Sequence, residues 1–434
     1  MRIYCLSLGC AKNKVDSECL AGELKRAGHE LVGDTEDSEV VIVNTCAFIQ
    51  PAVEESVAAI LDLEQLKHDG RLKKIGVVGC LVNRYGRELT DQMQSVDIWA
   101  KSEEWGDVLR ALGDEPRAGR CRSRLPLSSP FSRYLKISEG CDNRCAYCKI
   151  PDIRGGLRSL PVETIVKEAQ QMVSEGAREL CAVGQDLTAY GADTFGRTNL
   201  FELLDALESS LPKDVWVRLL YLHPARVTAR LLERVANGVQ ILPYLDIPIQ
   251  HADSRVLAAM NRGMEEKELF SIFDKAREIR KDFALRTTCM VGFPGEGEKE
   301  FSNLLRFVEK VKFDRMGAFS FFAEEGTAAS KAERQVRAAS KKRRLERLMA
   351  LQEEISAERQ GLFVGETLGV LVEEVKNDEG FAEGRSFREA PEVDGVVEIR
   401  KIRGNLQTGD VIRVKITETL AHDMLGEEVT VTAC

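Results

Sequence analysis

The run Cys141-Asp-Asn-Arg-Cys145-Ala-Tyr-Cys148 places three cysteines at C-x3-C-x2-C spacing within one short loop. Three thiolates on a four-iron cluster leave one iron without a protein ligand, and that open iron can bind another molecule. A structural zinc site is the alternative, but zinc usually takes four Cys or His ligands, and no second pair or suitably spaced His lies nearby. The spacing therefore favours a 4Fe-4S cluster with one open iron.

The cysteine loop follows the first of six apolar stretches that alternate with helical stretches between residues 133 and 330. Strands are expected at Tyr134–Ser138, Glu179–Val183, Val215–Leu220, Tyr244–Ile249, Leu285–Phe293 and Met316–Phe322. Helices are expected at Val162–Glu175, Asn199–Ser209, Val227–Ala236 and Lys267–Lys281. This alternation predicts a partial (βα)6 TIM-like barrel. The cysteine loop would then lie at the functional end of the barrel.

A second set of three cysteines lies in residues 1–115, where Cys10, Cys46 and Cys80 each follow an apolar run. Such runs, separated by helical segments, are typical of buried parallel strands in a doubly wound α/β domain. The three thiols would then converge beyond the carboxyl ends of the strands, where open α/β sheets bind ligands. Burial as a small hydrophobe would explain any one of them. Three at equivalent strand ends favour a second three-thiolate cluster.

Three further segments complete the domain organisation. Residues 116–132 lose periodicity and read as a linker. Residues 331–360 form a charged helical stretch whose basic run Lys341-Lys-Arg-Arg344 could touch RNA, but interspersed acidic residues favour a solvated connector. Residues 361–434 alternate in short strands, which predicts a small antiparallel β-barrel. Its strands are expected at Leu368–Glu374, Val396–Ile402 and Val411–Thr417.

Length and composition indicate a multidomain globular protein of the cytoplasm. The chain has 434 residues, of which 44% are hydrophobic and 30% charged, with a net charge of −9. It shows no signal-peptide pattern and no apolar stretch long enough for a membrane span, so no membrane partner is expected. Twelve cysteines in so large a chain suit a reducing compartment better than a disulfide scaffold. Six of the cysteines do not have the spacing of metal ligands, and we interpret them as packing residues: Cys5, Cys19, Cys121, Cys181, Cys289 and Cys434.

The contexts of both cysteine triplets resemble the radical S-adenosylmethionine (SAM) methylthiotransferase family, and in particular its RimO branch. The matching segments are Ser7-Leu-Gly-Cys-Ala-Lys-Asn-Lys-Val-Asp-Ser-Glu18, Asn44-Thr-Cys-Ala-Phe-Ile49 and Lys136-Ile-Ser-Glu-Gly-Cys141. The tRNA-modifying MiaB branch is similar, but it usually has Gln-Met-Asn where this chain has Ala11-Lys12-Asn13. The C-terminal segment, including Asn377-Asp-Glu-Gly380, is similar to the TRAM module of the family. Leu160 and Gly297 depart from the family pattern.

The resemblance implies cofactors and candidate binding residues. It implies two 4Fe-4S clusters, one held by Cys10, Cys46 and Cys80 and one by Cys141, Cys145 and Cys148. It also implies that SAM binds the open iron of the second cluster and is cleaved there to a 5'-deoxyadenosyl radical. Candidate SAM contacts are Tyr147, which could equally be barrel core, and residues after the barrel strands: Gly184, Gln185, Asp186, Gln250, Gly292 and Glu296. His251 could equally be a structural histidine.

The implied reaction is methylthiolation of an aspartate on small-subunit ribosomal protein twelve. The family uses two SAM molecules per turnover and an external electron donor. Residues 365–434 contain 8 Lys and Arg against 15 Asp and Glu, a formal charge of −7, which suits a basic protein better than tRNA. Two alternatives stay open: methylthiolation of a tRNA adenosine, and a non-catalytic iron-sulfur electron carrier.

Overall fold

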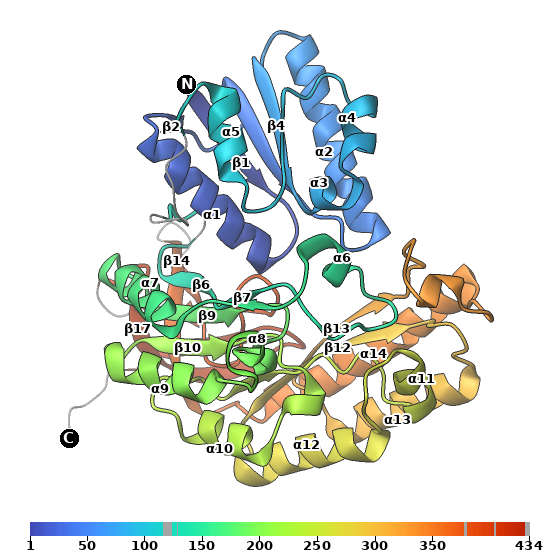
Figure 1. Cartoon of the computed structure of the whole chain (residues 1–434). Coiled ribbons are helices and arrows are strands. Elements are labelled where there is room, and N and C mark those ends of the chain that lie inside the picture. Colours follow the sequence, from blue (N-terminus) through green and yellow to red (C-terminus); the bar gives the residue numbers. More distant parts are fainter. Residues whose placement is uncertain (116–123, 128, 377–379, 403–404, 430–434) are drawn as a thin grey trace.

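The computed structural model of the chain describes residues 1–115, 124–127, 129–376, 380–402 and 405–429 (Figure 1). Cys121, Cys434, much of the expected linker and Asn377-Asp-Glu379 of the TRAM-like motif lie outside the described residues. An N-terminal α/β domain stands over a central barrel, and a small C-terminal β-barrel packs behind it (Figure 1). Among the described residues, no helix is both long and apolar enough to cross a membrane.

The N-terminal domain is a five-stranded parallel sheet in the order β2-β1-β3-β4-β5. Its strands are β1 Arg2–Ser7, β2 Glu30–Leu31, β3 Val40–Thr45, β4 Lys74–Gly79 and β5 Ile98–Ala100. Its helices are α1 Ala11–Arg26, α2 Gln50–His68, α3 Cys80–Tyr85, α4 Arg87–Gln92 and α5 Trp105–Leu112. Leucines of α1 and α5 pack on one face and those of α2 and α3 on the other. The predicted doubly wound fold is confirmed.

The central domain is an open barrel of six parallel strands in sequence order, with helices outside. The strands are β6 Ser132–Lys136, β9 Glu179–Val183, β10 Trp216–Leu219, β11 Tyr244–Asp246, β12 Ala284–Val291 and β13 Arg315–Ser320. The helices that follow them are α7 Val162–Ser174, α8 Ala192–Phe195, α9 Leu200–Ser210, α10 Ala229–Asn237, α11 Ser254–Ala259, α12 Glu266–Ile279 and α13 Glu298–Val311. A short hairpin, β7 Ser138–Glu139 with β8 Arg158–Ser159, flanks the cysteine loop and α6 Ile150–Arg154.

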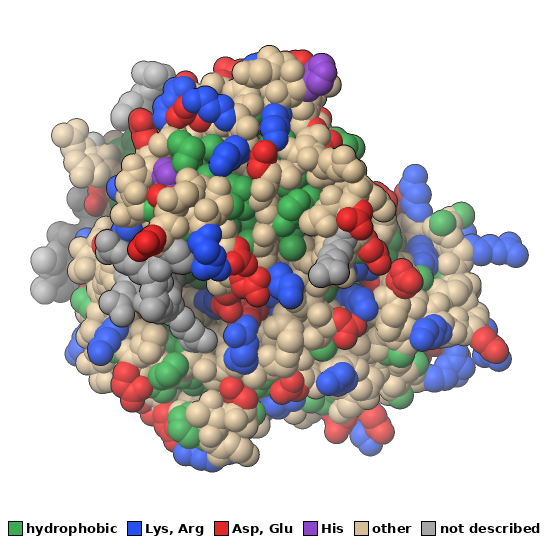
Figure 2. Space-filling model, turned by 45° about the horizontal axis from the view of Figure 1, so that its top comes forward, with side chains coloured by type: hydrophobic (Ala, Val, Ile, Leu, Met, Phe, Trp, Pro, Cys, Tyr) green, Lys and Arg blue, Asp and Glu red, His purple; other side chains and the backbone are tan. Residues whose placement is uncertain are grey.

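The predicted (βα)6 barrel is therefore confirmed, although its strands form two three-stranded sheets. The backbone N–H of Leu222 donates to the carbonyl of Asp246 across the junction between them. The charged helix expected over residues 331–360 begins later, as α14 Ala338–Gly361, because residues 329–331 form a single 3-10 turn and Ala332 is extended. Basic side chains project at the right-hand edge of the molecule in Figure 2, whereas both signs of charge are interspersed elsewhere on that face.

The C-terminal module is a closed five-stranded barrel. Its strands are β14 Thr367–Lys376, β15 Phe381–Arg385, β16 Val397–Arg400, β17 Val411–Thr419 and β18 Met424–Glu428. The expected barrel is confirmed with one correction to its strand directions. Four strand pairs are antiparallel, but β16 and β18 run parallel because the long connection through β17 returns the chain to the same edge in the same direction.

The module docks on the central barrel through buried charges and the segment that follows β15. Glu179 of β9, which is fully buried, accepts hydrogen bonds from Arg218 Nε at 2.8 Å and from Arg385 Nη2 at 2.7 Å. Arg218 Nη1 also donates to the carbonyl of Phe387 at 2.7 Å, and the Tyr244 hydroxyl donates to Asp394 at 2.6 Å. Neighbouring strand residues point outward to the helices, so this segment covers the inner face of the barrel.

Candidate functional site

Both cysteine triplets line one cavity of about 330 Å³ between the N-terminal domain and the central barrel. The cavity lies at the carboxyl ends of the barrel strands, which is the functional end of such barrels. Its wall includes the six predicted metal ligands: Cys10, Cys46, Cys80, Cys141, Cys145 and Cys148. The predicted cofactor contacts Tyr147, Gln185 and Gln250 also line it. Residues separated by up to 309 positions in the sequence thus share one chamber.

The N-terminal cysteines meet because three strand ends approach closely. Cys10 precedes α1, Cys46 follows β3 and Cys80 begins α3 directly after β4. Gly9 has a φ of +88°, and a Cβ there would lie 2.6 Å from Cys46 Cβ, so glycine allows the approach. Asn13 fixes the loops, since its Nδ2 donates to the carbonyls of Leu8 and Thr45, both at 2.9 Å.

The barrel cysteines lie in the loop between β7 and α6, which is anchored on both sides. The Ala146 N–H donates to the Met260 carbonyl at 2.9 Å, and the Ala146 carbonyl accepts from Ala329 N–H at 2.8 Å. Tyr147 is buried against apolar residues of the barrel mouth, including Met260. The tyrosine therefore packs in the core and also borders the cavity, so both roles considered for it are compatible with its position.

The cysteine triplets are spaced more widely than the sulfur ligands of a tetrahedral zinc site. Tetrahedral zinc with Zn–S bonds of about 2.3 Å holds its sulfurs about 3.8 Å apart. Within the part of the chain that the structure describes, neither cysteine triplet brings its three Sγ atoms within 4.8 Å of one another. Burial raises the pKa of Cys80 and of Cys148 to about 12, so metal binding has to displace their protons. Arg154 Nε donates to Cys80 Sγ at 3.1 Å, a contact that favours the thiolate.

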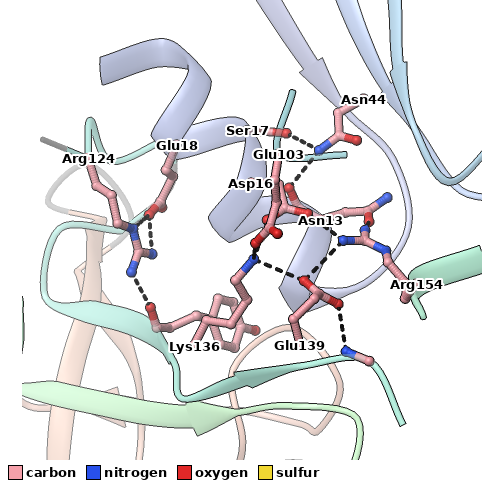
Figure 3. Close-up of polar contacts among 12 residues, drawn as sticks. Asn13, Asp16, Ser17, Glu18, Asn44, Glu103, Arg124, Lys136, Glu139 and Arg154 are labelled. Carbon is pink, nitrogen blue, oxygen red and sulfur yellow. Dashed lines mark hydrogen bonds and ion pairs between the residues drawn. The ribbon is translucent and has the colours of Figure 1, made fainter. Parts of the chain in front are cut away.

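A buried polar network, of which Arg154 also lines the cavity, holds the two domains together (Figure 3). Asp16 of α1 accepts from Lys136 Nζ at 2.6 Å and from Arg154 Nη1 at 2.7 Å, and both cations also contact Glu139. Burial opposes ionisation of Asp16, but Lys136 and Arg154 together lower its pKa. Because Lys136 precedes the barrel cysteine loop and Arg154 follows it, the network fixes that loop against the N-terminal domain.

Asp16, Glu103 and Glu139 bring carboxylate oxygens within 4.8 Å of one another, as a cation site would require. Lys136 Nζ lies 2.6 to 3.0 Å from an oxygen of each of the three. The lysine ammonium therefore occupies the place that a metal ion would take. A second pair, Glu18 with Arg124 at 2.5 Å, lies beside this network and brings part of the expected linker into the interface (Figure 3).

Three residues that line the cavity hold a left-handed backbone conformation. Arg144, Tyr221 and Gln250 have φ values of +51°, +66° and +68°. Such strain is uncommon outside glycine and concentrates at functional sites, where the surrounding structure maintains it. The side-chain Oε1 of Gln250 is buried and has no hydrogen-bond partner among the described residues, so it is available to a bound molecule.

Four of the predicted cofactor contacts lie behind the cavity wall. Asp186 is buried and accepts from Asn143 at 2.7 Å, so it supports the cysteine loop from behind. Gly184 leaves no room for a Cβ, which would lie 2.5 Å from Ser138 Oγ. Glu296 accepts from the backbone N–H groups of Gly292 and Phe293, and it contacts Arg344 of α14.

Two titratable groups of this region are both buried, and burial shifts the pKa of each toward its neutral form. Burial raises the pKa of Glu296 to about 7, even though Arg344 lies beside it. Burial lowers the pKa of His251 to about 4, and its Nδ1 accepts from the Asp253 N–H at 3.0 Å. His251 is fully buried, which fits a structural role, one of the two interpretations that its sequence position allowed.

Several cavity residues could not be found from cysteine spacing. Most of them lie close to a predicted ligand or in or just after a barrel strand: Lys12, Phe48, Asn143, Arg144, Tyr221, His223, Thr288 and Phe319. Arg154 and Arg262 line the cavity from other positions. Lys12, Asn143 and Arg144 lie within two residues of a cysteine, which is a signal that the sequence does carry. Arg154 and Arg262 reach the cavity only through tertiary packing.

Three family models match the chain in order. Residues 2–101 match the uncharacterized protein family UPF0004, residues 135–308 the radical SAM superfamily, and residues 364–429 the TRAM domain. The radical SAM match contains Cys141, Cys145 and Cys148, and the first match contains Cys10, Cys46 and Cys80. A radical-SAM domain implies SAM and a 4Fe-4S cluster, and the donor set of the barrel loop fits that cluster.

Similar curated proteins are described as ribosomal protein uS12 methylthiotransferase RimO. The protein from Aquifex aeolicus is 41% identical, with 99% of this chain and 97% of the relative covered. The protein from Desulfotalea psychrophila is 42% identical, with coverage of 99% and 100%. The chain belongs to the RimO methylthiotransferase family. It is a radical-SAM transferase, as the resemblance of its cysteine segments predicted.

Solved structures share the fold at low sequence identity. The radical SAM methyltransferase TsrM from Kitasatospora setae has a TM-score of 0.52 at 12% identity, covering 74% of this chain and 72% of that chain. The cobalamin-dependent radical enzyme OxsB has a TM-score of 0.52 at 12% identity, covering 82% of this chain and 56% of that chain. These likenesses support an α/β domain joined to a radical-SAM barrel.

Proposed function

We propose that this protein adds a methylthio group to the β-carbon of an aspartate of ribosomal protein uS12. The observation that carries the proposal is the single cavity lined by both cysteine triplets. Replacing an unactivated C–H bond by C–S requires a radical step and a sulfur donor, and one chamber lets both act on the same carbon. The names of the relatives supply the substrate protein.

We assign two 4Fe-4S clusters to the cavity, one to Cys10, Cys46 and Cys80 and one to Cys141, Cys145 and Cys148. When bound, the barrel cluster with SAM supplies hydrogen abstraction, and the N-terminal cluster supplies the sulfur that SAM methylates. The protein positions these groups and excludes bulk water. Gln250 offers a free carbonyl oxygen to a ligand amine or hydroxyl, and the Tyr147 ring borders the ligand space. The remaining predicted cofactor contacts would act indirectly, by supporting the residues of the cavity wall: Gly184, Asp186, Gly292 and Glu296.

Further assignments follow from this function. We propose domains at residues 1–115, 133–330 and 361–434, joined by a linker at 116–132 and a connector at 331–360. A cluster held by Cys141, Cys145 and Cys148 would need an electron from an external donor to cleave SAM. A ribosomal-protein substrate and thiolate ligands both suit the reducing cytoplasm. The names of the relatives described above do not point to methylthiolation of tRNA or to simple electron transfer.

Mass spectrometry of uS12 and of digested tRNA from a strain lacking this protein tests the proposal. The expected result is loss of a methylthio group from one uS12 aspartate, with every tRNA nucleoside unchanged. Restoring the chain should restore the modification, and restoring a Cys141→Ala variant should not. Loss of a tRNA modification with uS12 unaffected would refute the substrate assignment.

Charge on the TRAM module should affect the capture of uS12. Glu374 and Glu418 are exposed, and Glu374 makes only a long contact of 3.9 Å with Lys376. Glu373 and Glu427 are engaged more closely, with Arg385 and Lys401. Reversing Glu374 and Glu418 to Lys should slow association with uS12 about 2- to 10-fold, because complementary charge mainly accelerates encounter. Binding should also weaken as salt rises to about 0.5 M, since screening shortens the reach of surface charges.

The single variants Glu374→Lys and Glu418→Lys each have a matched control in Glu233→Lys on the outer helix α10, which makes the same change of two charge units away from the TRAM module. Surface plasmon resonance with immobilised uS12 measures both association rate and salt dependence. Faster capture of uS12 by the reversed variant, or tight tRNA binding by the wild-type chain at moderate salt, would contradict the electrostatic argument.

A further inference from the structure

Lys12 is a buried cation that faces the shared cavity. It lies in the first turn of α1, two residues after Cys10, and only 6% of it is exposed. The residue lines the cavity together with the six cysteines. Its Nζ lies 3.8 Å from the centroid of the Tyr221 ring. Among the described residues, Lys12 Nζ has neither a hydrogen-bond acceptor nor a carboxylate partner.

The other cationic side chains of the cavity have different surroundings. Arg154 forms ion pairs with Asp16 and Glu139. Arg262 donates to the carbonyl of Pro248 and to Cys145 Sγ, so it is held at the barrel cysteines. Arg144 is exposed. Among the described residues that line the cavity, Arg262 also has one buried donor without a partner, its Nε. Lys12 differs in that none of the donors of its ammonium group has a hydrogen-bond acceptor there.

A buried ammonium group without a directly paired anion is costly. Glu139 favours the charged form of Lys12 from beyond ion-pair distance, and the ring face compensates for only part of the lost hydration. The ring is itself held in a strained position, since Tyr221 has a φ of +66°. Two hydrogen bonds maintain that backbone: Tyr221 N–H donates to Asp246 at 3.0 Å, and its carbonyl accepts from Leu187 N–H at 3.1 Å. The fold therefore holds the Lys12 ammonium group and the Tyr221 ring at the cavity wall, where the ammonium group can bind an anionic group of a ligand.

We propose that Lys12 binds the side-chain carboxylate of the substrate aspartate and thereby selects aspartate over neutral side chains. This inference rests on the proposed function. The carbon that reacts is bonded directly to the carboxyl carbon, so the group that holds the carboxylate also fixes the reacting carbon. Lys12 belongs to the N-terminal domain and lines the cavity that both cysteine triplets share. A carboxylate bound to Lys12 would therefore place the reacting carbon in the space between the two triplets. Lys12 is in this sense a specificity-determining residue.

The test compares binding of uS12 with binding of a uS12 variant whose modified aspartate is replaced by asparagine. Reconstituted wild-type protein should bind the aspartate form about 30-fold more tightly, since loss of a buried charge partner has an effect of that order. Lys12→Met keeps the side-chain length but removes the charge, and it should bind both forms equally weakly. Lys12→Arg should restore part of the discrimination.

Lys14→Met is the matched control, because Lys14 lies on the same helix but pairs with Glu392 outside the cavity. It should discriminate as the wild type does. Iron content and 5'-deoxyadenosine formation should be unchanged in Lys12→Met. These readouts separate substrate recognition from a role at the metal or the cofactor.

Undiminished discrimination by Lys12→Met would overturn the proposal. Loss of iron or of SAM binding in that variant would overturn it as well, because Lys12 would then serve the cluster or the cofactor. A wild-type protein that binds and modifies uS12 but does not distinguish aspartate from asparagine would refute Lys12 recognition alone. A wild-type protein that binds neither form would refute the proposed function itself.

Discussion

Replacing Cys141, Cys145 and Cys148 together by alanine is expected to abolish SAM cleavage and to lower the iron content by about four per chain, because no thiolate would hold the barrel cluster. Replacing Cys10, Cys46 and Cys80 should also lower iron by about four while leaving SAM cleavage intact. Methylthiolation should be lost in both variants. The separation of the two activities is the decisive result, because the cavity places both triplets together.

The measurements are iron and sulfide analysis after anaerobic reconstitution, with chromatography of 5'-deoxyadenosine after addition of SAM and a strong reductant. Cys5→Ala serves as control for the N-terminal domain and Cys289→Ala for the barrel, since neither residue lines the cavity. Both controls should retain full iron content. Unchanged iron in the N-terminal triple variant would rule out a second cluster, and absence of 5'-deoxyadenosine from the wild type would rule out radical-SAM chemistry.

Glu179→Gln is expected to destabilise the protein by about 3–5 kcal/mol, because it removes the charge that compensates two buried arginines. Glu179 bridges Arg218 of the barrel and Arg385 of the TRAM module, and its Oε2 also accepts from Ser132. Urea unfolding of the reduced chain measures the loss. The matched control is Glu373→Gln, which removes the partly exposed second partner of Arg385 and should cost about 0–1 kcal/mol.

Acid should reveal the same interaction. Burial raises the pKa of Glu179, but Arg385 and Arg218 outweigh it and bring the value to about 2. A carboxyl group whose folded pKa is depressed contributes stability that is present above its unfolded pKa of about 4.3 and is lost as pH falls toward the folded value. Stability of the wild type should therefore fall between about pH 4.5 and pH 2 more steeply than that of Glu179→Gln. If the stability of the wild type and that of Glu179→Gln fell equally steeply with pH, the interaction of Glu179 with its two arginines would be shown to contribute little to stability.

The same contacts argue against deleting the TRAM module to test its role. Removal of Arg385 and Arg388 would leave Glu179 and Asp314 buried without those cationic partners. A truncated chain should therefore lose barrel stability as well as substrate capture. Exposed charge reversals such as Glu374→Lys avoid this difficulty.

The sequence pattern predicted the strands of the first two domains well, because buried parallel strands consist of continuous runs of apolar residues. Glu179–Val183 was located to the residue, and the three strand-end cysteines of the N-terminal domain converge as their positions required. The four helix starts expected in the barrel lie within two residues of those observed, whereas the connector helix begins seven residues later than expected. The polar first turn of α1, including Lys12 and Asn13, has no amphipathic pattern because those residues turn to the cavity and its loops.

The finer structure of the site could not be read from the sequence. Asp186 and Glu296 follow barrel strands as cofactor contacts do, yet both turn backward to satisfy loop N–H or side-chain donors. Arg218 and Arg385 resemble surface charges in sequence, and only the fold shows that they are buried. The parallel pair β16–β18 depends on the path of the intervening chain, which local alternation does not specify.

The buried pair of Glu179 and Arg385 joins residues 206 positions apart, which affects how the chain can fold during its synthesis. Bacterial ribosomes add about 5–20 residues per second, so all six barrel strands emerge well before Arg385 and Arg388. During that interval Glu179 and Asp314 lack those cationic partners and are best solvated by water. A nascent chain halted before residue 385 should therefore carry a loosely closed, protease-sensitive barrel. The barrel becomes resistant when the last module folds onto its inner face.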